Sequence, residues 1–187
     1  MTVPAPSDSA ASAEPSLAEV ISTRLRDVPD FPQAGVVFKD IAPLLADPAV
    51  FNACIDALAE LPAAYEADLI AGVEARGFVV AAALARAVDA GVVLVRKAGK
   101  LPPPTVSARY ELEYGSAEIE VPLGLLEGKN VYLVDDVLAT GGTLRATIAL
   151  LNEAGAHVTG IGVLVELSFL AGRDRLTGPD LTALLTL

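Results

Sequence analysis

Acidic, hydroxyl and small residues stand together in the last third of the sequence, in the string Val131-Tyr-Leu-Val-Asp-Asp-Val-Leu-Ala-Thr-Gly-Gly-Thr143. A turn of small residues that opens a helix presents consecutive backbone N–H groups to a phosphate, and threonine hydroxyls add further donors. The glycines let the main chain approach the phosphate closely. The two carboxylates are poor phosphate ligands, but they accept hydrogen bonds from neighbouring sugar hydroxyls. We therefore predict a ribose-phosphate site made by Asp135, Asp136, Ala139, Thr140, Gly141, Gly142 and Thr143.

The string also has a simpler interpretation, a strand that ends in solvated aspartates before a Gly-Gly turn, because both residue types are common in turns. The complete string favours the phosphate site, since strand, paired acids, glycines and helix follow one another in the order that this chemistry needs. A Walker-type ATP site is disfavoured because no G-x-x-x-x-G-K-[ST] pattern is present here.

Basic residues gather in one window of an otherwise acidic chain. Between positions 76 and 109, six of the thirteen Lys and Arg residues accompany a single acid, Asp89. They are Arg76, Arg86, Arg96, Lys97, Lys100 and Arg109. Singly, each is most simply a solvated loop residue, but jointly they favour a local site for a small anion.

Composition limits the class of protein. With 187 residues, of which 53% are hydrophobic, the chain is long enough for one well-buried core, and we expect a single domain over residues 16–187. The net charge of −11 and pI near 4.4 argue against nucleic-acid and anionic-membrane partners. Residues 1–15 lack a basic start and a long apolar run, so we expect a disordered tail and no signal peptide. Apolar stretches elsewhere are shorter than the ~20 residues of a membrane helix.

The single cysteine, Cys54, excludes an internal disulfide, and the single histidine, His157, leaves no Cys/His cluster for zinc. Both facts suit a reducing cytoplasm. We expect Cys54 to be a core residue, and His157, which starts a predicted strand remote from the motifs, to be structural.

Hydrophobic periodicity predicts the elements that position these residues. Ser16 and Glu19 form a capping-box pattern before helically spaced Leu17, Val20, Ile21, Leu25 and Val28, and Asp47 and Pro48 look like the start of a second helix. Apolar strands at 69–73, 92–95, 131–134 and 158–165 alternate with helices at 78–88 and 143–154.

This alternation predicts a doubly wound α/β fold with a mainly parallel sheet flanked by helices, whose ligands bind beyond the carboxyl ends of the strands. The pattern fails between positions 95 and 131, where a proline-rich basic segment precedes a polar one with alternating apolar residues. We interpret this segment as a long β-hairpin that serves as a functional lid.

The string at 131–143 resembles the motif with which type I phosphoribosyltransferases bind 5-phosphoribosyl 1-diphosphate (PRPP). Three further segments are similar to the adenine-specific members: Asp30-Phe-Pro-Gln-Ala-Gly-Val-Val-Phe-Lys-Asp-Ile41, Glu74-Ala-Arg-Gly-Phe78, and Arg96-Lys-Ala-Gly-Lys-Leu-Pro102 with Tyr110-Glu-Leu-Glu-Tyr-Gly115. With Leu164-Val-Glu-Leu167, the similarity covers roughly residues 16–176. The family more often has arginine where Lys39 stands, and the tail after Leu176 matches poorly.

The resemblance implies an enzyme that joins adenine to the ribose phosphate of PRPP and releases pyrophosphate. The further PRPP contacts it implies are Arg76, Arg96, Lys97, Lys100 and Tyr114, and the adenine contacts are Val37, Phe38, Lys39, Val137 and Leu167. Mg²⁺ would arrive with PRPP and have few direct protein ligands. The family is usually dimeric, which implies a homodimer.

The resemblance also implies that Glu113, on the lid, exchanges a ring proton with adenine, although Glu111 shares its strand face and the pattern cannot rank the two. We expect Asp136→Asn and Gly141→Val each to weaken PRPP binding and leave the fold intact. Two alternatives stay open: a phosphoribosyltransferase for xanthine or for hypoxanthine and guanine, and a PRPP-sensing regulator that binds a nucleic acid or protein.

Overall fold

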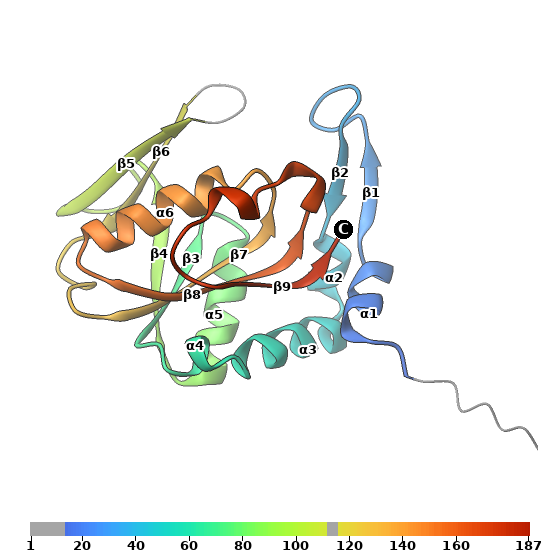
Figure 1. Ribbon diagram of the computed structural model, residues 1–187, viewed down its shortest axis with the longest axis horizontal. Helices are drawn as coiled ribbons and strands as arrows, with labels where there is room; N and C mark the ends of the chain where they lie inside the picture. The colour runs from blue at the N-terminus through green and yellow to red at the C-terminus, as the bar shows by residue number, and fades with distance from the viewer. Residues whose placement is uncertain (1–13, 112–115) are drawn as a thin grey trace, which may run out of the picture.

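A seven-stranded sheet organises the computed structural model, which describes residues 14–111 and 116–187. Its strands lie in the order β5-β6-β4-β3-β7-β8-β9 (Figure 1). Five of them, β4, β3, β7, β8 and β9, pair in parallel, whereas β6 pairs antiparallel with both β4 and β5. The predicted doubly wound, mainly parallel α/β fold is therefore confirmed.

The predicted alternation of strands and helices is present with slightly longer elements. The strands are β3 (Leu69–Val73), β4 (Gly91–Lys97), β7 (Asn130–Leu138), β8 (His157–Glu166) and β9 (Leu181–Thr186). The helices that follow them include α5 (Gly77–Val88) and α6 (Gly142–Glu153), and short 3₁₀ turns span Ser168–Leu170 and Arg173–Arg175.

The predicted end of β7 is wrong. We expected the strand to stop at Val134, but it continues to Leu138, so Asp135 and Asp136 lie within it. The reason is pairing: Asp135 is opposite Val163 and Val137 is opposite Val165 in β8, so the neighbouring strand extends the ladder past the acids. The two carboxylates therefore extend from inside a strand and not from its end.

Hydrophobic side chains fill both faces of the sheet. On one face α6 packs over residues such as Val93, Val95, Leu133 and Ile161. On the other face α1, α3 and α5 cover a second cluster. Cys54 is fully buried in this second cluster, as predicted. Strands buried on both sides are what near-continuous apolar runs in a parallel sheet indicate.

The first helix is shorter than predicted. The capping box of Ser16 and Glu19 is present, but α1 (Leu17–Thr23) ends before Leu25, and Val28 belongs to strand β1 (Arg26–Pro29). Val28 precedes Pro29, and a residue before proline is driven away from helical geometry. Strand β1 pairs with β2 (Val37–Asp40) in a separate hairpin that the sequence did not predict.

The second predicted helix is confirmed as α3 (Pro48–Ala59), which Asp47 caps by accepting two backbone N–H bonds. Two short helices, α2 (Ala42–Ala46) and α4 (Pro62–Tyr65), flank it without having been predicted. Each is too short to show a helical period.

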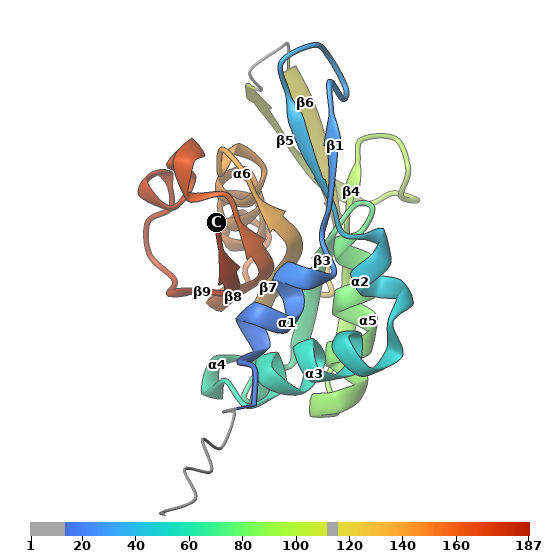
Figure 2. The same ribbon diagram turned by 90° about the vertical axis from the view of Figure 1, so that its right-hand side faces the viewer.

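The predicted hairpin consists of β5 (Thr105–Glu111) and β6 (Ser116–Pro122), and β6 attaches it to β4, the last of the parallel strands on that side of the sheet. Both hairpins, β1–β2 and β5–β6, project past the same end of the sheet (Figures 1 and 2). No helix within the described ranges is long and apolar enough to span a membrane. Thirteen N-terminal residues of the predicted tail lie outside those ranges, so that prediction stays untested.

Candidate active site

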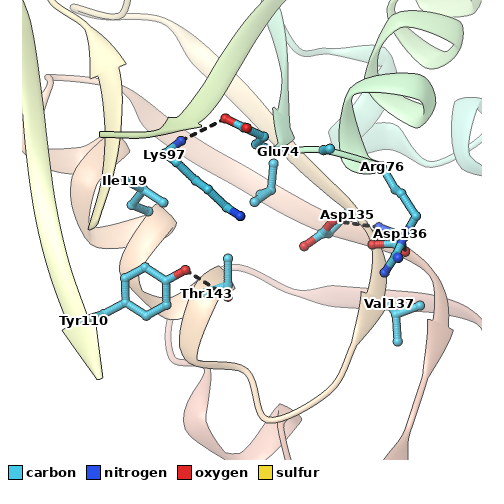
Figure 3. A pocket seen from close by; sticks show the side chains of 11 residues that line it. Glu74, Arg76, Lys97, Tyr110, Ile119, Asp135, Asp136, Val137 and Thr143 are labelled. Atoms are coloured by element: carbon cyan, nitrogen blue, oxygen red, sulfur yellow. Dashed lines mark hydrogen bonds and ion pairs between the residues drawn. The ribbon is translucent and has the colours of Figure 1, made fainter. Parts of the chain in front are cut away.

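The ends of β3, β4 and β7 surround a polar cavity of about 360 Å³ (Figure 3). Its walls come from the loop after β3, from Lys97 at the end of β4, from Tyr110 and Ile119 of the β5–β6 hairpin, and from the acids of β7. The lining residues are Val73, Glu74, Ala75, Arg76, Lys97, Tyr110, Ile119, Asp135, Asp136, Val137 and Thr143. We call this space the polar cavity.

The predicted phosphate turn forms a smaller recess of about 70 Å³ where β7 leads into α6. All seven predicted residues of the turn except Asp136 line it. Gly141 precedes the helix with φ of +78°, in the left-handed region that only glycine enters without strain. The helix N-terminus and the turn therefore offer unpaired backbone N–H groups and two threonine hydroxyls to one small anion.

Besides its positive φ, glycine at position 141 has a reason that the sequence did not suggest. A Cβ atom built there would lie 2.4 Å from the carbonyl oxygen of Gly172, not in the phosphate recess. Gly172 is equally constrained, since its own Cβ would lie 2.0 Å from the carbonyl oxygen of Ala139. The expectation that Gly141→Val leaves the fold intact is therefore wrong, because the side chain would collide with backbone and force φ out of its region.

Asp135 and Asp136 occupy different environments. Asp136 is buried and forms an ion pair with Arg76, which comes from the loop between β3 and α5. Burial and the neighbouring Asp136 raise the pKa of Asp135 well above the usual range of a carboxyl group. The glycine at 77 allows this packing, since a Cβ there would lie 3.0 Å from Oδ1 of Asp135. Asp136 is thus a carboxylate paired with a cation, whereas Asp135 has no such partner among the described residues and is available to accept hydrogen bonds from a ligand.

The basic residues do not all reach the polar cavity. Lys97 lines it, and its ammonium group points into the space between Thr143 and Asp135 (Figure 3). Arg96 instead donates to the Glu74 carboxylate at 3.4 Å and to the carbonyl oxygen of Lys100 at 3.0 Å. Lys100 is exposed and does not line the polar cavity. Of these three residues, Lys97 lines the polar cavity and the other two do not, and their contacts with PRPP stay predictions.

Glu74 was not singled out from the sequence, yet it shapes the entrance of the polar cavity. Its carboxylate accepts the backbone N–H of Lys97 at 3.0 Å, and this hydrogen bond lowers the pKa of the carboxyl group. The contact joins the loop after β3 to the end of β4. A glutamate in a sequence motif does not reveal this role, because its partner lies 23 residues away.

A second, more apolar cavity of about 620 Å³ adjoins the first. All five predicted adenine contacts, Val37, Phe38, Lys39, Val137 and Leu167, line it. The structure adds Gly35, Val36, Arg76, Ala139, Phe169 and Leu170. We call this space the apolar cavity. Arg76 and Val137 line both cavities, so the two spaces meet at the ion pair of Arg76 and Asp136.

Aromatic contacts fix one wall of the apolar cavity. Phe38 packs edge to face against Phe31, with ring centroids 5.2 Å apart, and the guanidinium carbon of Arg76 lies 5.7 Å from the centre of its ring. Lys39 lines the cavity, and its ammonium group forms an ion pair with Asp27 at 2.7 Å. Phe169, which no sequence pattern singled out, also lines this cavity and is 69% exposed.

Two predicted residues cannot be placed. Glu113 and Tyr114 lie outside the described residues, as does the side chain of Glu111. His157 is exposed and lines a separate polar depression with Asn152 and Asp180, away from every residue predicted for the site. The described ranges contain no group of three His, Cys, Asp or Glu side chains arranged to hold a metal ion.

The fold and these cavities define a class of protein: a doubly wound α/β protein with a helix-opening phosphate turn beside paired acids at the carboxyl edge of its sheet. The sequence matches the phosphoribosyl transferase domain over residues 41–178. It is 53% identical over 177 residues to an adenine phosphoribosyltransferase of Frankia casuarinae, with 94% of each chain covered.

Solved structures agree with this assignment. The adenine phosphoribosyltransferase of Rhodothermus marinus is 43% identical with a TM-score of 0.85, covering 91% of this chain and 98% of its own. The Saccharomyces cerevisiae enzyme, solved with D-2,5-dideoxy-2,5-imino-altritol 1,6-bisphosphate and adenine, is 37% identical with a TM-score of 0.81, covering 90% and 98%. The chain belongs to the phosphoribosyltransferase family, among its adenine phosphoribosyltransferases.

Proposed function

We propose that this protein is a purine-salvage enzyme that converts adenine and PRPP to AMP and pyrophosphate. The observation that carries the proposal is the junction of the two cavities at Arg76 and Val137. A flat heterocycle fits an apolar, aromatic-walled space, whereas a ribose with phosphates needs hydroxyl acceptors and cations. The reacting carbon of the ribose would lie where the two spaces meet.

The 5-phosphate of PRPP would bind in the recess at the start of α6. Backbone N–H groups and the hydroxyls of Thr140 and Thr143 supply neutral donors there, and the dipole of α6 favours a dianion. Asp135 and Asp136 would accept hydrogen bonds from the ribose hydroxyls. This arrangement grips the sugar and its phosphate with one continuous segment.

The diphosphate would occupy the polar cavity near Lys97 and the loop after β3. Negative charge grows on this leaving group as the glycosidic bond opens, so a cation positioned beforehand lowers the barrier. Lys97 points into this space (Figure 3). Arg96 and Lys100 lie at its outer edge and would contribute through rearrangement on binding or through the long-range field.

Mg²⁺ would accompany PRPP. The oxygen donors that line the polar cavity, from Asp135, Asp136 and Glu74, suit this hard cation. Since these described carboxylates do not form a three-ligand cluster, the ion would take most of its ligands from the diphosphate, the ribose and water. When bound, it supplies neutralisation of phosphate charge, and the protein residues orient the sugar through their hydrogen bonds.

Adenine would bind in the apolar cavity between Phe38 on one side and Val137 and Leu167 on the other, with main-chain groups near Val37 and Lys39 at its edge. Its ring must lose a proton as the new bond forms. We propose that Glu113, which lies in the sequence between β5 and β6, accepts that proton. The support is the family resemblance of the segment around Glu113 and the lining of the polar cavity by Tyr110, which is three residues away in the sequence.

We expect Glu113→Gln to lower kcat by roughly 10²- to 10⁴-fold, the usual worth of general acid–base catalysis, with much smaller changes in the affinities for PRPP and adenine. Single-turnover measurements in which chemistry limits the rate would test this. Glu111→Gln is the matched control and should be milder. Near-normal turnover of the Glu113 variant would assign the residue a lid-positioning role only.

The base specificity is tested by incubating the purified protein with Mg²⁺, PRPP and, separately, adenine, hypoxanthine, guanine and xanthine. We expect AMP from adenine and little product from the oxopurines, which present a carbonyl where adenine has an amine. If another nucleotide were made faster than AMP, the corresponding base, and not adenine, would be the substrate. The absence of any product would favour a PRPP-sensing regulator.

We further propose that the enzyme acts as a homodimer in the cytoplasm. The apolar side chains of Val79 on α5 and of Val92 and Leu94 on β4 are between 37% and 47% exposed and come from adjoining elements. Their burial against a second copy would remove apolar area from water. The free thiol of Cys54 is compatible with a reducing compartment.

A further inference from the structure

The segment that carries Lys97 turns back through an exposed stretch after β4, and a buried acid lies beneath that turn. Glu120, on β6, is only 5% exposed. Its Oε1 accepts the backbone N–H groups of Lys100 and Leu101, each at 2.7 Å, and its Oε2 lies 3.5 Å from the hydroxyl of Thr105. All these donors belong to residues between the end of β4 and the start of β5. One carboxylate therefore binds the connecting segment at three residues.

Charge and burial make this contact costly to disturb. Burial alone would raise the pKa of Glu120, but hydrogen bonds from the backbone of Leu101, Lys100 and Gly99 outweigh it, and the pKa is lowered. The group is thus ionised at neutral pH, and hydrogen bonds to an ionised acceptor are stronger than neutral ones. Loss of the charge would leave several N–H groups without an equivalent acceptor.

The turn is held on its other side by Glu74, which lines the polar cavity, and by Arg96. Glu74 accepts the N–H of Lys97, and Arg96 donates both to Glu74 and to the carbonyl oxygen of Lys100. The turn is therefore clamped between the loop after β3 and the hairpin strand β6. Since Lys97 is the last residue of β4, this clamp fixes the main chain from which its side chain extends into the polar cavity.

We infer that Glu120 is a positioning residue for phosphoribosyl transfer, which holds the turn at residues 97–101 so that Lys97 faces the diphosphate leaving group. The inference rests on the proposed function, because that function places the diphosphate of PRPP beside Lys97. It predicts a defect specific to PRPP and pyrophosphate, since the apolar cavity has no lining residue in the turn.

Glu120→Gln tests this role, because the amide keeps the shape but removes the charge. We expect KM for PRPP to rise about tenfold or more, the size of one charge-assisted hydrogen bond, while KM for adenine changes less than about twofold. Inhibition by pyrophosphate should weaken in parallel. Equal effects on both substrates, or no effect on PRPP, would overturn the inference.

Glu118→Gln is the matched control. Glu118 lies two residues away on the same face of β6, but its carboxylate accepts hydrogen bonds from the side chains of Ser107 and Arg109 on β5. Its contact with the turn is a main-chain one, in which its carbonyl oxygen accepts the N–H of Ala98, and the substitution keeps that contact. We expect wild-type kinetic constants for this variant. If its defect equalled that of Glu120→Gln, general weakening of the hairpin would explain both results and the inference would fail.

Amide hydrogen exchange followed by NMR tests the clamp in the wild-type protein without any substitution. The N–H groups of Lys100 and Leu101 should exchange slowly despite the exposure of Lys100, and Glu120→Gln should accelerate them selectively. Fast exchange in the wild type would refute the hydrogen bonds, even if Glu120→Gln failed to fold. A wild-type protein that made no nucleotide but protected both amides would refute the proposed function and, with it, the role in transfer, while leaving the clamp intact.

Discussion

The Asp135 carboxyl group lies beside Asp136 in a poorly solvated part of β7, and both conditions raise its pKa. A carboxyl whose folded-state pKa exceeds its unfolded value of about 3.9 holds a proton more tightly when folded. Wild-type stability therefore falls as pH rises from that value through the folded-state pKa, and the deficit remains at neutral pH. The energetic cost is tolerated because the ionised acid would bind the ribose.

We predict that Asp135→Asn raises the free energy of unfolding at pH 7 without ligand and weakens PRPP binding by about tenfold or more, since a charged acceptor is lost. Chemical unfolding from pH 4 to 7, compared with wild type, should show an advantage of the variant that grows with pH. Calorimetry with PRPP and Mg²⁺ would measure the second effect. A variant that is less stable than wild type at pH 7 would contradict the assigned environment.

Tyr132 of β7 also carries a buried polar group, its hydroxyl. Among the described residues, its hydroxyl is the buried side-chain polar atom that has no hydrogen-bond partner, and burial raises its pKa. Its side chain packs against Gly160 and Gly162 of β8. A Cβ atom built at Gly160 would lie 2.8 Å from the ring carbon Cε2 of Tyr132, and one built at Gly162 would lie 2.8 Å from its hydroxyl oxygen, both closer than a normal contact. The ring is therefore a packing element and the hydroxyl a cost.

We predict that Tyr132→Phe stabilises the protein by about 1 kcal/mol, because it removes an unsatisfied hydroxyl and keeps the ring. Urea unfolding with an unchanged m-value would measure this gain, and kinetic constants for both substrates should stay at wild-type values. A loss of stability of similar size would show that the hydroxyl has a partner in solution, such as a bound water.

At the scale of elements, the turn between β7 and α6 depends on a close approach of two backbone segments. The contact of Gly141 with Gly172 joins the phosphate recess to the 3₁₀ turns after β8, which also carry Leu170 and Phe169 of the apolar cavity. One packing contact therefore couples the walls of the two proposed substrate sites.

We predict that Gly141→Ala destabilises the protein by more than the roughly 1–3 kcal/mol that a left-handed backbone alone costs, because its Cβ also meets a carbonyl oxygen. Gly124→Ala is the control: Gly124 has a similar φ of +82°, but nothing lies within 4 Å of its Cβ position. Urea unfolding of both variants would separate strain from collision. Equal losses would show that the approach of Gly172 relaxes without cost.

For the whole molecule, the proposed homodimer uses the apolar surface of α5 and β4. We predict that sedimentation velocity at micromolar concentration gives about twice the 19.2 kDa chain mass. Leu94→Glu should shift the protein towards monomer, because a charge would be buried without a partner. Leu125→Glu, a substitution of an exposed leucine in the turn after β6, should not. A wild-type monomer, or two identical profiles for the variants, would contradict this interface.

Patterns that depend on neighbouring residues were readable from the sequence. The capping box at Ser16, the Asp47 cap, the alternating strands and the turn at 139–143 all follow from local hydrogen bonds and backbone angles. The family resemblance added the membership of the chain among phosphoribosyltransferases. The β1–β2 hairpin escaped prediction because its strands have four residues each, too few for a clear alternation.

Only the tertiary structure decided where the charged side chains go. Sequence proximity grouped Arg76, Arg96, Lys97 and Lys100 as one anion site, but Arg76 pairs with Asp136, 60 positions away, and Arg96 turns to Glu74. These pairings follow from the strand order, which sets β3 between β4 and β7 although β7 comes much later in the chain. Because a long side chain takes whichever partner the neighbouring strand supplies, its direction is a property of the assembled sheet.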